Sequence, residues 1–157
     1  MNDIILTIKI NILTPMVKQI EALLLETRRL YEAMYRFDEA AASALGIHLS
    51  DLRCVNALEH GPLKAGEIGE RLGLTSGSVT ALINRLERAG FVVKNRSKED
   101  ARQVHVHLKP NFYKQADAIY GRLGKSVSSQ FQELGIEEIE QAIVTINRLS
   151  AGFDQAV

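Results

Sequence analysis

This sequence is poor in several residue types, and each shortage excludes a class of protein. Its 157 residues include a single cysteine, Cys54, which rules out an internal disulfide framework and a cysteine-based metal site and fits a reducing cytoplasm. No apolar run approaches the roughly 18 residues that a membrane-spanning helix needs. The chain starts with an acidic residue, Asp3, where a secretory signal would be basic. We therefore expect a cytoplasmic protein with no membrane partner.

The chain also has no excess of basic or acidic residues. The chain has 19 basic and 19 acidic residues, and a net charge of zero by itself counts against binding to a polyanion. The charges are nevertheless unevenly distributed, and the C-terminal tail from residue 130 onward is mainly acidic. Between residues 94 and 109, five basic residues stand against two acidic ones; the basic residues are Lys94, Arg96, Lys98, Arg102 and Lys109. We therefore expect this segment to form a positively charged surface that binds a partner.

The apolar residues, 46% of the chain, are enough for a buried core and mostly follow helical spacing. One long helix is predicted over residues 14–45, ending at Gly46. Its apolar surface is too broad for a single contact, which favours packing on a partner subunit as well as on its own domain. Upstream, residues 4–12 alternate apolar and polar side chains, a strand-like pattern to which we assign no function.

Three short helices are predicted next, over residues 51–60, 65–72 and 76–89. Ser50 is the expected cap of the first, and Gly73 the expected end of the second. Because only Leu74 and a polar pair separate the second from the third, the two are joined by the tight turn of a helix-turn-helix. Two longer helices follow, over residues 110–134 and 137–153, separated by Gly135.

The helix over residues 76–89 has two different faces. Val79, Leu82, Ile83 and Leu86 fall together and are expected in the core. The opposite face has small or polar side chains, with two further polar residues on its flanks; together these residues are Gly77, Ala81, Asn84, Arg88, Thr80 and Arg85. Such a face lets a helix approach base edges, while Ser76 and Ser78 at the N-terminus can hold a phosphate. The alternative is an ordinary amphipathic surface helix.

A hairpin with a charged tip is predicted after this helix. Val104, Val106 and Leu108 alternate with the polar Gln103, His105 and His107, so the apolar side is expected to pack on the domain. Lys98 and Arg102 flank the tip, within reach of phosphate or a narrow minor groove. A helix-turn-helix followed by such a hairpin is the layout of a winged helix, although a charged tip alone is also typical of a solvated turn.

The run LTSGSVTALINRLERAGFV, followed by Asp100-x-Arg102 and a Pro-Asn helix start, resembles the MarR (multiple antibiotic resistance regulator) family of winged helix-turn-helix transcription factors. The resemblance covers about residues 23–153. It implies a mainly α (α+β) fold with long N- and C-terminal dimerisation helices. It also implies a homodimer on a pseudo-palindromic, double-stranded DNA operator, released by a small ligand or by oxidation. The chain then divides into an extension (1–13), dimerisation helices (14–48 and 110–157) and a DNA-binding lobe (49–109).

The resemblance also implies which residues contact DNA. The positions from which the family's recognition helix reads DNA are held here by Ser76, Gly77, Ser78, Thr80, Ala81 and Arg85. Arg102 matches the arginine of the wing, and Asp100 the carboxylate that orients its turn. Ala81 and Ala101 depart from the basic residues of many members, so we expect fewer charged contacts and more recognition by shape.

Candidate sensing residues are few. Cys54 lies on the apolar side of its helix, where a thiol is usually buried and inert. A small aromatic effector, which the family resemblance implies, would have a cleft lined by Tyr31, Tyr35, Phe37 and Arg53, although aromatics at helical spacing are more often core. His105 and His107 share a strand face but have no metal-ligating partner nearby, so we expect neither a metal nor a cofactor.

Two functions remain open at this point. The leading one is a ligand-responsive transcriptional regulator, most often a repressor in such families. The alternative is a winged-helix module for protein interaction without specific DNA binding, which the zero net charge favours. Catalysis is not expected, because the sequence has no nucleophile–base grouping or phosphate-binding glycine loop.

Overall fold

The computed structural model describes residues 2–96 and 103–156, with side chains from Pro15 onward. The chain forms two units, Met1–Phe112 and Tyr113–Val157, and each is described by itself.

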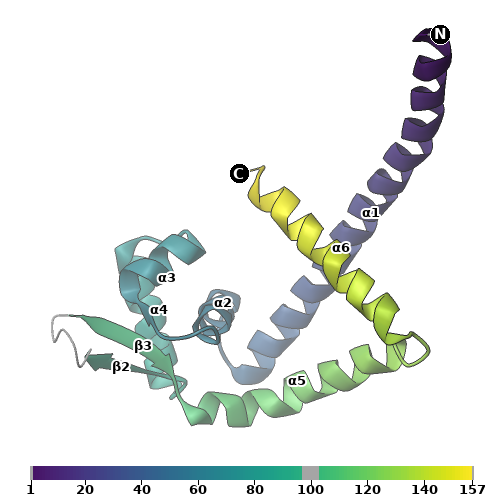
Figure 1. Ribbon diagram of the computed structural model, residues 1–157. Coiled ribbons are helices and arrows are strands. Elements are labelled where there is room, and N and C mark those ends of the chain that lie inside the picture. Colours follow the sequence, from purple (N-terminus) through teal and green to yellow (C-terminus); the bar gives the residue numbers. More distant parts are fainter. Residues whose placement is uncertain (1, 97–102, 157) are drawn as a thin grey trace. The chain divides into compact units, whose positions relative to one another are not determined.

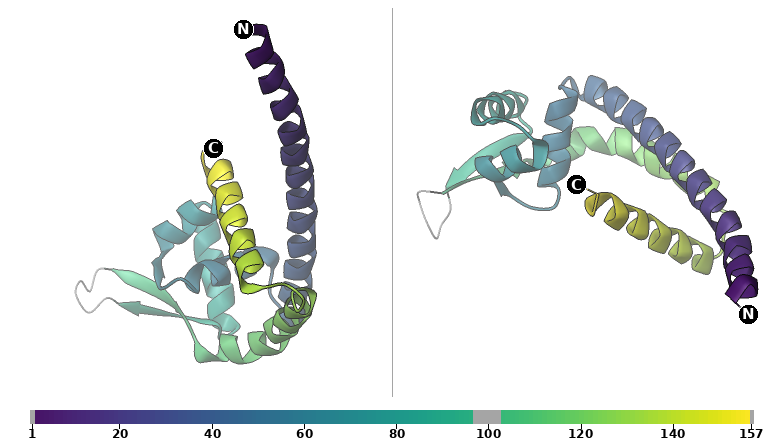
Figure 2. Two further views of the ribbon diagram at one scale, coloured as in Figure 1. Left: turned by 45° about the vertical axis from the view of Figure 1, so that its right-hand side comes forward. Right: turned by 90° about the horizontal axis from the view of Figure 1, so that it is seen from above.

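Helix α1 (Asn2–Leu45) is one continuous helix that contains Pro15 (Figures 1 and 2). The strand-like interpretation of residues 4–12 was therefore wrong. Ile4, Ile8 and Ile12 recur every four residues, so the same segment also satisfies helical spacing, and its alternation was a weaker signal than its continuity with the helix that follows. The predicted end is confirmed: Gly46 has a φ of 67°, a conformation that glycine adopts without strain.

Helices α2 (Leu49–Leu58), α3 (Ala65–Leu72) and α4 (Ser76–Arg88) form the predicted helix-turn-helix lobe. Ser50 does not cap α2, as the sequence suggested. The helix begins two residues earlier than predicted, with His48 as its N-cap, and the His48 N–H donates to the Asp51 carboxylate over 3.4 Å. Gly73 ends α3 in the left-handed conformation, with a φ of 65°.

A small antiparallel sheet completes the lobe (Figure 1). Strands β2 (Val92–Arg96) and β3 (Val104–Leu108) form the predicted hairpin, with Val92 paired to Leu108 and Arg96 to Val104. A two-residue strand, β1 (Leu63–Lys64), pairs with the other edge of β3. Sequence patterning missed β1 because two residues are too short to show a periodicity.

The core of the first unit lies among the three short helices and the sheet. Every residue predicted to be on the inner face of α4 is buried. Phe91, just before β2, packs edge-on against Phe112 near the start of α5, with ring centroids 5.7 Å apart and both side chains buried. Val106 is buried and Leu108 is half-buried, but Val104 is 41% exposed. The predicted inward face of β3 therefore fails at its first residue, which is the farthest along the hairpin from the core.

The second unit consists of most of α5 (Pro110–Gln130), a turn, and α6 (Ile136–Asp154). Helix α5 ends at Gln130, before the predicted residue 134. Gly135 is the N-cap of α6, and its N–H donates to the Glu138 carboxylate over 2.8 Å. Across residues 2–96 and 103–156, none of the helices is long and apolar enough to cross a membrane.

Candidate nucleic-acid interface

The N-terminal half of α4 has an exposed surface of small and hydroxyl side chains. Thr75 caps the helix by accepting a hydrogen bond from the Ser78 N–H, and the two hydroxyls lie 3.0 Å apart. Five predicted site residues in this half of the helix are exposed; they are Ser76, Gly77, Ser78, Thr80 and Ala81. Small side chains keep this part of the backbone accessible, and the exposed N–H groups at a helix start favour an anion.

The close packing of α3 against α4 depends on a glycine. A Cβ on Gly69 would lie 3.2 Å from the Leu74 carbonyl oxygen and 3.3 Å from a methyl of Val79. These contacts are tighter than ordinary van der Waals separation, so with a larger residue here its neighbours would have to shift by a few tenths of an ångström. We therefore expect Gly69 to contribute to the close packing of α3 on α4.

Asn84 lies on the same exposed face, farther along α4, and is engaged by the sheet. The Lys94 ammonium, on β2, donates to the Asn84 side-chain oxygen and to the Glu87 carboxylate, over 2.8 Å each. Arg88 turns back along the helix and donates from Nε to the Asn84 carbonyl over 3.2 Å. The predicted site residue Asn84 is therefore part of a polar cluster that includes Lys94 and Glu87.

Arg85 has a role that the sequence did not reveal. Its guanidinium donates to both carboxylate oxygens of Asp51 on α2, from Nε over 3.0 Å and from Nη2 over 2.6 Å. Asp51 is 1% exposed, whereas the Arg85 side chain is 35% exposed. The hydrogen bond to this carboxylate raises the pKa of the guanidinium, and the Asp51 charge adds to the shift. Arg85 thus ties α4 to α2. The two residues are 34 positions apart, so no local pattern could have paired them.

The wing is described only along its strands. Arg96, at the end of β2, is exposed, as a residue that contacts a partner must be. The predicted site residues Lys98, Asp100 and Arg102 lie outside the described residues, and so does Ala101. Their assignment stays a prediction.

Two of the four candidate effector residues line one hollow. Tyr31 and Tyr35 are exposed on α1, with ring centroids 6.3 Å apart, and line a shallow hollow together with Glu32 and Arg36. Phe37 is half-buried and Arg53 is exposed on α2, and neither lines this hollow. The assignment of the four residues to an effector site stays a prediction.

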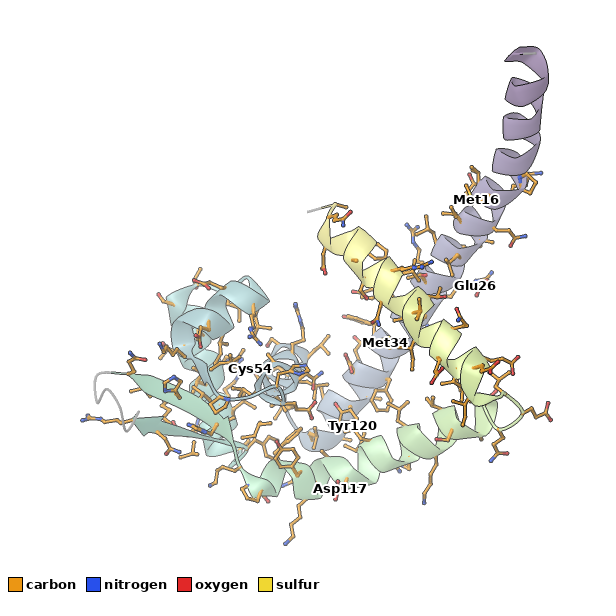
Figure 3. The ribbon with its side chains drawn as sticks, viewed as in Figure 1. Met16, Glu26, Met34, Cys54, Asp117 and Tyr120 are labelled. Carbon is orange, nitrogen blue, oxygen red and sulfur yellow. The ribbon has the colours of Figure 1, made fainter. Side chains whose placement is uncertain are left out.

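Cys54 is buried, and the two histidines of β3 lie near each other. Cys54 lies on α2 (Figure 3) and is fully buried. Burial raises the pKa of its thiol to about 12, and the nearby Asp51 charge adds to the shift. His105 and His107 have ring centroids 6.5 Å apart. Within residues 2–96 and 103–156, no group of three or more metal-ligating side chains is present.

The comparisons with known proteins agree with this geometry. A family model described as the MarR family matches residues 45–103. The HTH-type transcriptional regulator YcgE of Bacillus subtilis is 38% identical over 114 residues, covering 72% of this chain and 74% of that protein. This chain belongs to the MarR family. A second relative, the HTH-type transcriptional regulator YkoM of the same organism, is 38% identical over 88 residues, covering 56% of this chain and 57% of that protein.

Solved structures confirm the MarR-family fold. The disulfide-formed AbfR superimposes with a TM-score of 0.62 at 23% identity, covering 92% of this chain and 96% of that one. The Staphylococcus aureus MepR–DNA complex superimposes with a TM-score of 0.57 at 18% identity, covering 80% and 96%. The predicted fold, a mainly helical winged helix-turn-helix with long terminal helices, is therefore correct.

Proposed function

We propose that this protein is a DNA-binding transcriptional regulator that places α4 in the major groove of its operator. The observation that carries the proposal is the exposed face of α4, where small and polar side chains surround a capped helix N-terminus. Two comparisons support it: the relatives are named as transcriptional regulators, and the MepR structure with the same fold contains DNA.

The interface combines direct and positioning contacts. Ser76, Gly77, Ser78, Thr80 and Ala81 approach the bases and the nearest phosphate, with Asn84 farther along the helix. On the wing, Arg96, Lys98 and Arg102 contact the DNA backbone, and Asp100 orients the turn. Arg85 serves the interface through its bond to Asp51, which holds the recognition helix in place.

The active form is a homodimer. The described helices outside the lobe carry many apolar side chains that are exposed in a single chain. A second copy of the protein would remove these side chains from water. On α1 these include Met16 and Met34 (Figure 3) and Leu30, which is 52% exposed; on α6 they include Ile143, which is 53% exposed. Two symmetric copies would present two recognition helices to a pseudo-palindromic operator.

We further propose a repressor in the cytoplasm that responds to a small aromatic effector, with no cofactor, metal or catalytic activity. The hollow at Tyr31 and Tyr35, a pair of exposed rings with the charged Arg36 beside them, supports the effector.

Binding to the protein's own promoter region tests the DNA-binding function. The affinity should fall steeply with salt, because lysine and arginine side chains displace counterions from phosphates. Arg102→Ala should weaken binding by roughly 1 to 3 kcal/mol and lower the salt slope by about one. Absence of binding at low salt to any genomic fragment would instead favour a protein-interaction module, which the zero net charge of the chain allows.

A further inference from the structure

The polar cluster of Lys94, Asn84 and Glu87 determines which hydrogen bonds the exposed face of α4 can offer. A lysine ammonium has only donors, so its contact with Asn84 is made to the amide oxygen, at 2.8 Å. The same ammonium bonds Glu87 one turn farther along the helix, which neutralises the carboxylate and holds the lysine over the pair. The acceptor of Asn84 is therefore engaged inside the protein.

Among residues 15–96 and 103–156, only the oxygen of the Asn84 amide has a hydrogen-bond partner, so both hydrogens of the nitrogen can go to an outside partner. An asparagine that reads adenine must both donate to N7 and accept from the N6 amino group. Lys94 occupies one of the two lone pairs of the Asn84 oxygen, and its positive charge disfavours a second donor there, so the pairing with adenine is weakened. Asn84 can still donate, and guanine presents two adjacent acceptors, N7 and O6, on its major-groove edge, whereas thymine presents one acceptor beside a methyl group.

We propose that Asn84 reads a guanine in each half-site of the operator, and that Lys94 sets this preference by holding the amide oxygen. The inference rests on the proposed DNA-binding function and adds to it a base identity and a specificity-determining residue on β2. Lys94 acts through Asn84 and is a positioning residue.

The surroundings of the cluster support a fixed orientation. Lys94 lies in the paired part of β2, opposite Val106, which is buried, so its backbone is anchored in the sheet. Asn84 and Glu87 lie on one face of the continuous helix α4, three residues apart. Arg88 donates to the Asn84 carbonyl and does not compete for the side-chain oxygen.

Selection of bound sequences from a randomised DNA library tests the inference, with the full-length protein and three variants. Lys94→Met removes the ammonium but keeps the length of the side chain, and Asn84→Ala removes the amide. Lys109→Met is the matched control, because it removes one exposed lysine from the end of the hairpin without touching Asn84. Circular dichroism of each variant checks that the fold is retained.

The wild type should select guanine at one position of each half-site, and a change of that guanine to adenine should weaken binding roughly tenfold. Lys94→Met should reduce this penalty to less than about threefold, because the freed amide oxygen can then accept from adenine. Asn84→Ala should lose the preference, and Lys109→Met should keep it. Replacing the guanine with 7-deazaguanine, which lacks the N7 acceptor, should weaken the wild type but leave Asn84→Ala unchanged.

The inference and the underlying function fail in different ways. If neither the wild type nor any variant binds DNA, the proposed function is wrong. If the wild type binds but selects adenine or thymine at the position that Asn84→Ala affects, the assignment of guanine is wrong. If Lys94→Met keeps the full wild-type penalty against adenine, Lys94 does not set the preference.

Discussion

At the scale of single residues, the bond between Arg85 and Asp51 is asymmetric. Asp51 is almost fully buried, while Arg85 is about one-third exposed. A guanidinium left without its partner can turn toward water, but a buried carboxylate left without its partner cannot. The two residues therefore differ in what their loss does to the protein.

We expect Arg85→Met to lower the free energy of unfolding by about 3 kcal/mol, because it leaves the Asp51 charge buried without a partner. Asp51→Asn should cost less, since it removes the buried charge and keeps a polar group. Urea unfolding at one fixed protein concentration measures both. An equal or larger loss for Asp51→Asn would contradict the asymmetry. Arg85→Met should also leave the salt slope of DNA binding unchanged, unlike Arg102→Ala.

Cys54 illustrates how burial makes a thiol unreactive. With its pKa raised to about 12, the thiol is almost entirely protonated at neutral pH. We expect iodoacetamide to alkylate it at least about a hundredfold more slowly in the folded protein than in urea, where the pKa is ordinary. Mass spectrometry at successive times measures both rates. Rapid labelling of the native protein would show that Cys54 is accessible and would reopen a redox role.

The same shift predicts a pH dependence. A folded-state pKa raised from 9.0 to about 12 means that the unfolded chain releases this proton first as the pH rises. The contribution of Cys54 to stability is therefore complete below about pH 9 and is lost between about pH 9 and 12. Cys54→Ala should show a shallower loss of stability across this range than the wild type, measured by denaturant unfolding.

At the scale of elements, the two glycines of α3 provide a matched pair. Gly69→Ala should lower stability by about 1 to 2 kcal/mol, because its Cβ would press on the Leu74 carbonyl and Val79. Gly66→Ala should be neutral or stabilise by up to about 1 kcal/mol, since nothing lies within 4 Å of its Cβ and alanine favours a helix. Thermal melts of both variants test this, and equal effects would show that Gly69 does not contribute to the close packing of the helices.

Element boundaries show how far the sequence was informative. Helical periodicity and terminal glycines placed α3 and α4 to within about one residue, because those signals are local. The sequence did not predict the first turns of α1, because alternating isoleucines imitate a strand. It also did not predict strand β1, which exists only through its pairing with β3. Val104 alternates correctly but stays exposed, since alternation cannot tell how far the core extends along a hairpin.

At the scale of the whole molecule, the proposed dimer makes the sharpest prediction. Leu30→Arg on α1 and Ile143→Arg on α6 each place a charge on an exposed apolar surface and should convert a dimer to a monomer. Arg29→Ala is the control, because it removes only an exposed pair with Glu26. Sedimentation velocity reads the oligomeric state directly. A wild type that is monomeric at micromolar concentration would exclude the dimer.

The operator should reflect the symmetry of such a dimer. Two recognition helices reading successive major grooves require half-site centres roughly 34 to 36 Å apart. A footprint on one asymmetric half-site would contradict this arrangement.

The sequence by itself determined the family, the helix-turn-helix and the exposed face of α4, because these depend on short-range periodicity, turn residues and a contiguous motif. Only the tertiary structure decided how that face is held. It paired Arg85 with Asp51 and Lys94 with Asn84. The physical reason is that side-chain pairing across elements depends on their three-dimensional packing, which spacing along the chain does not encode.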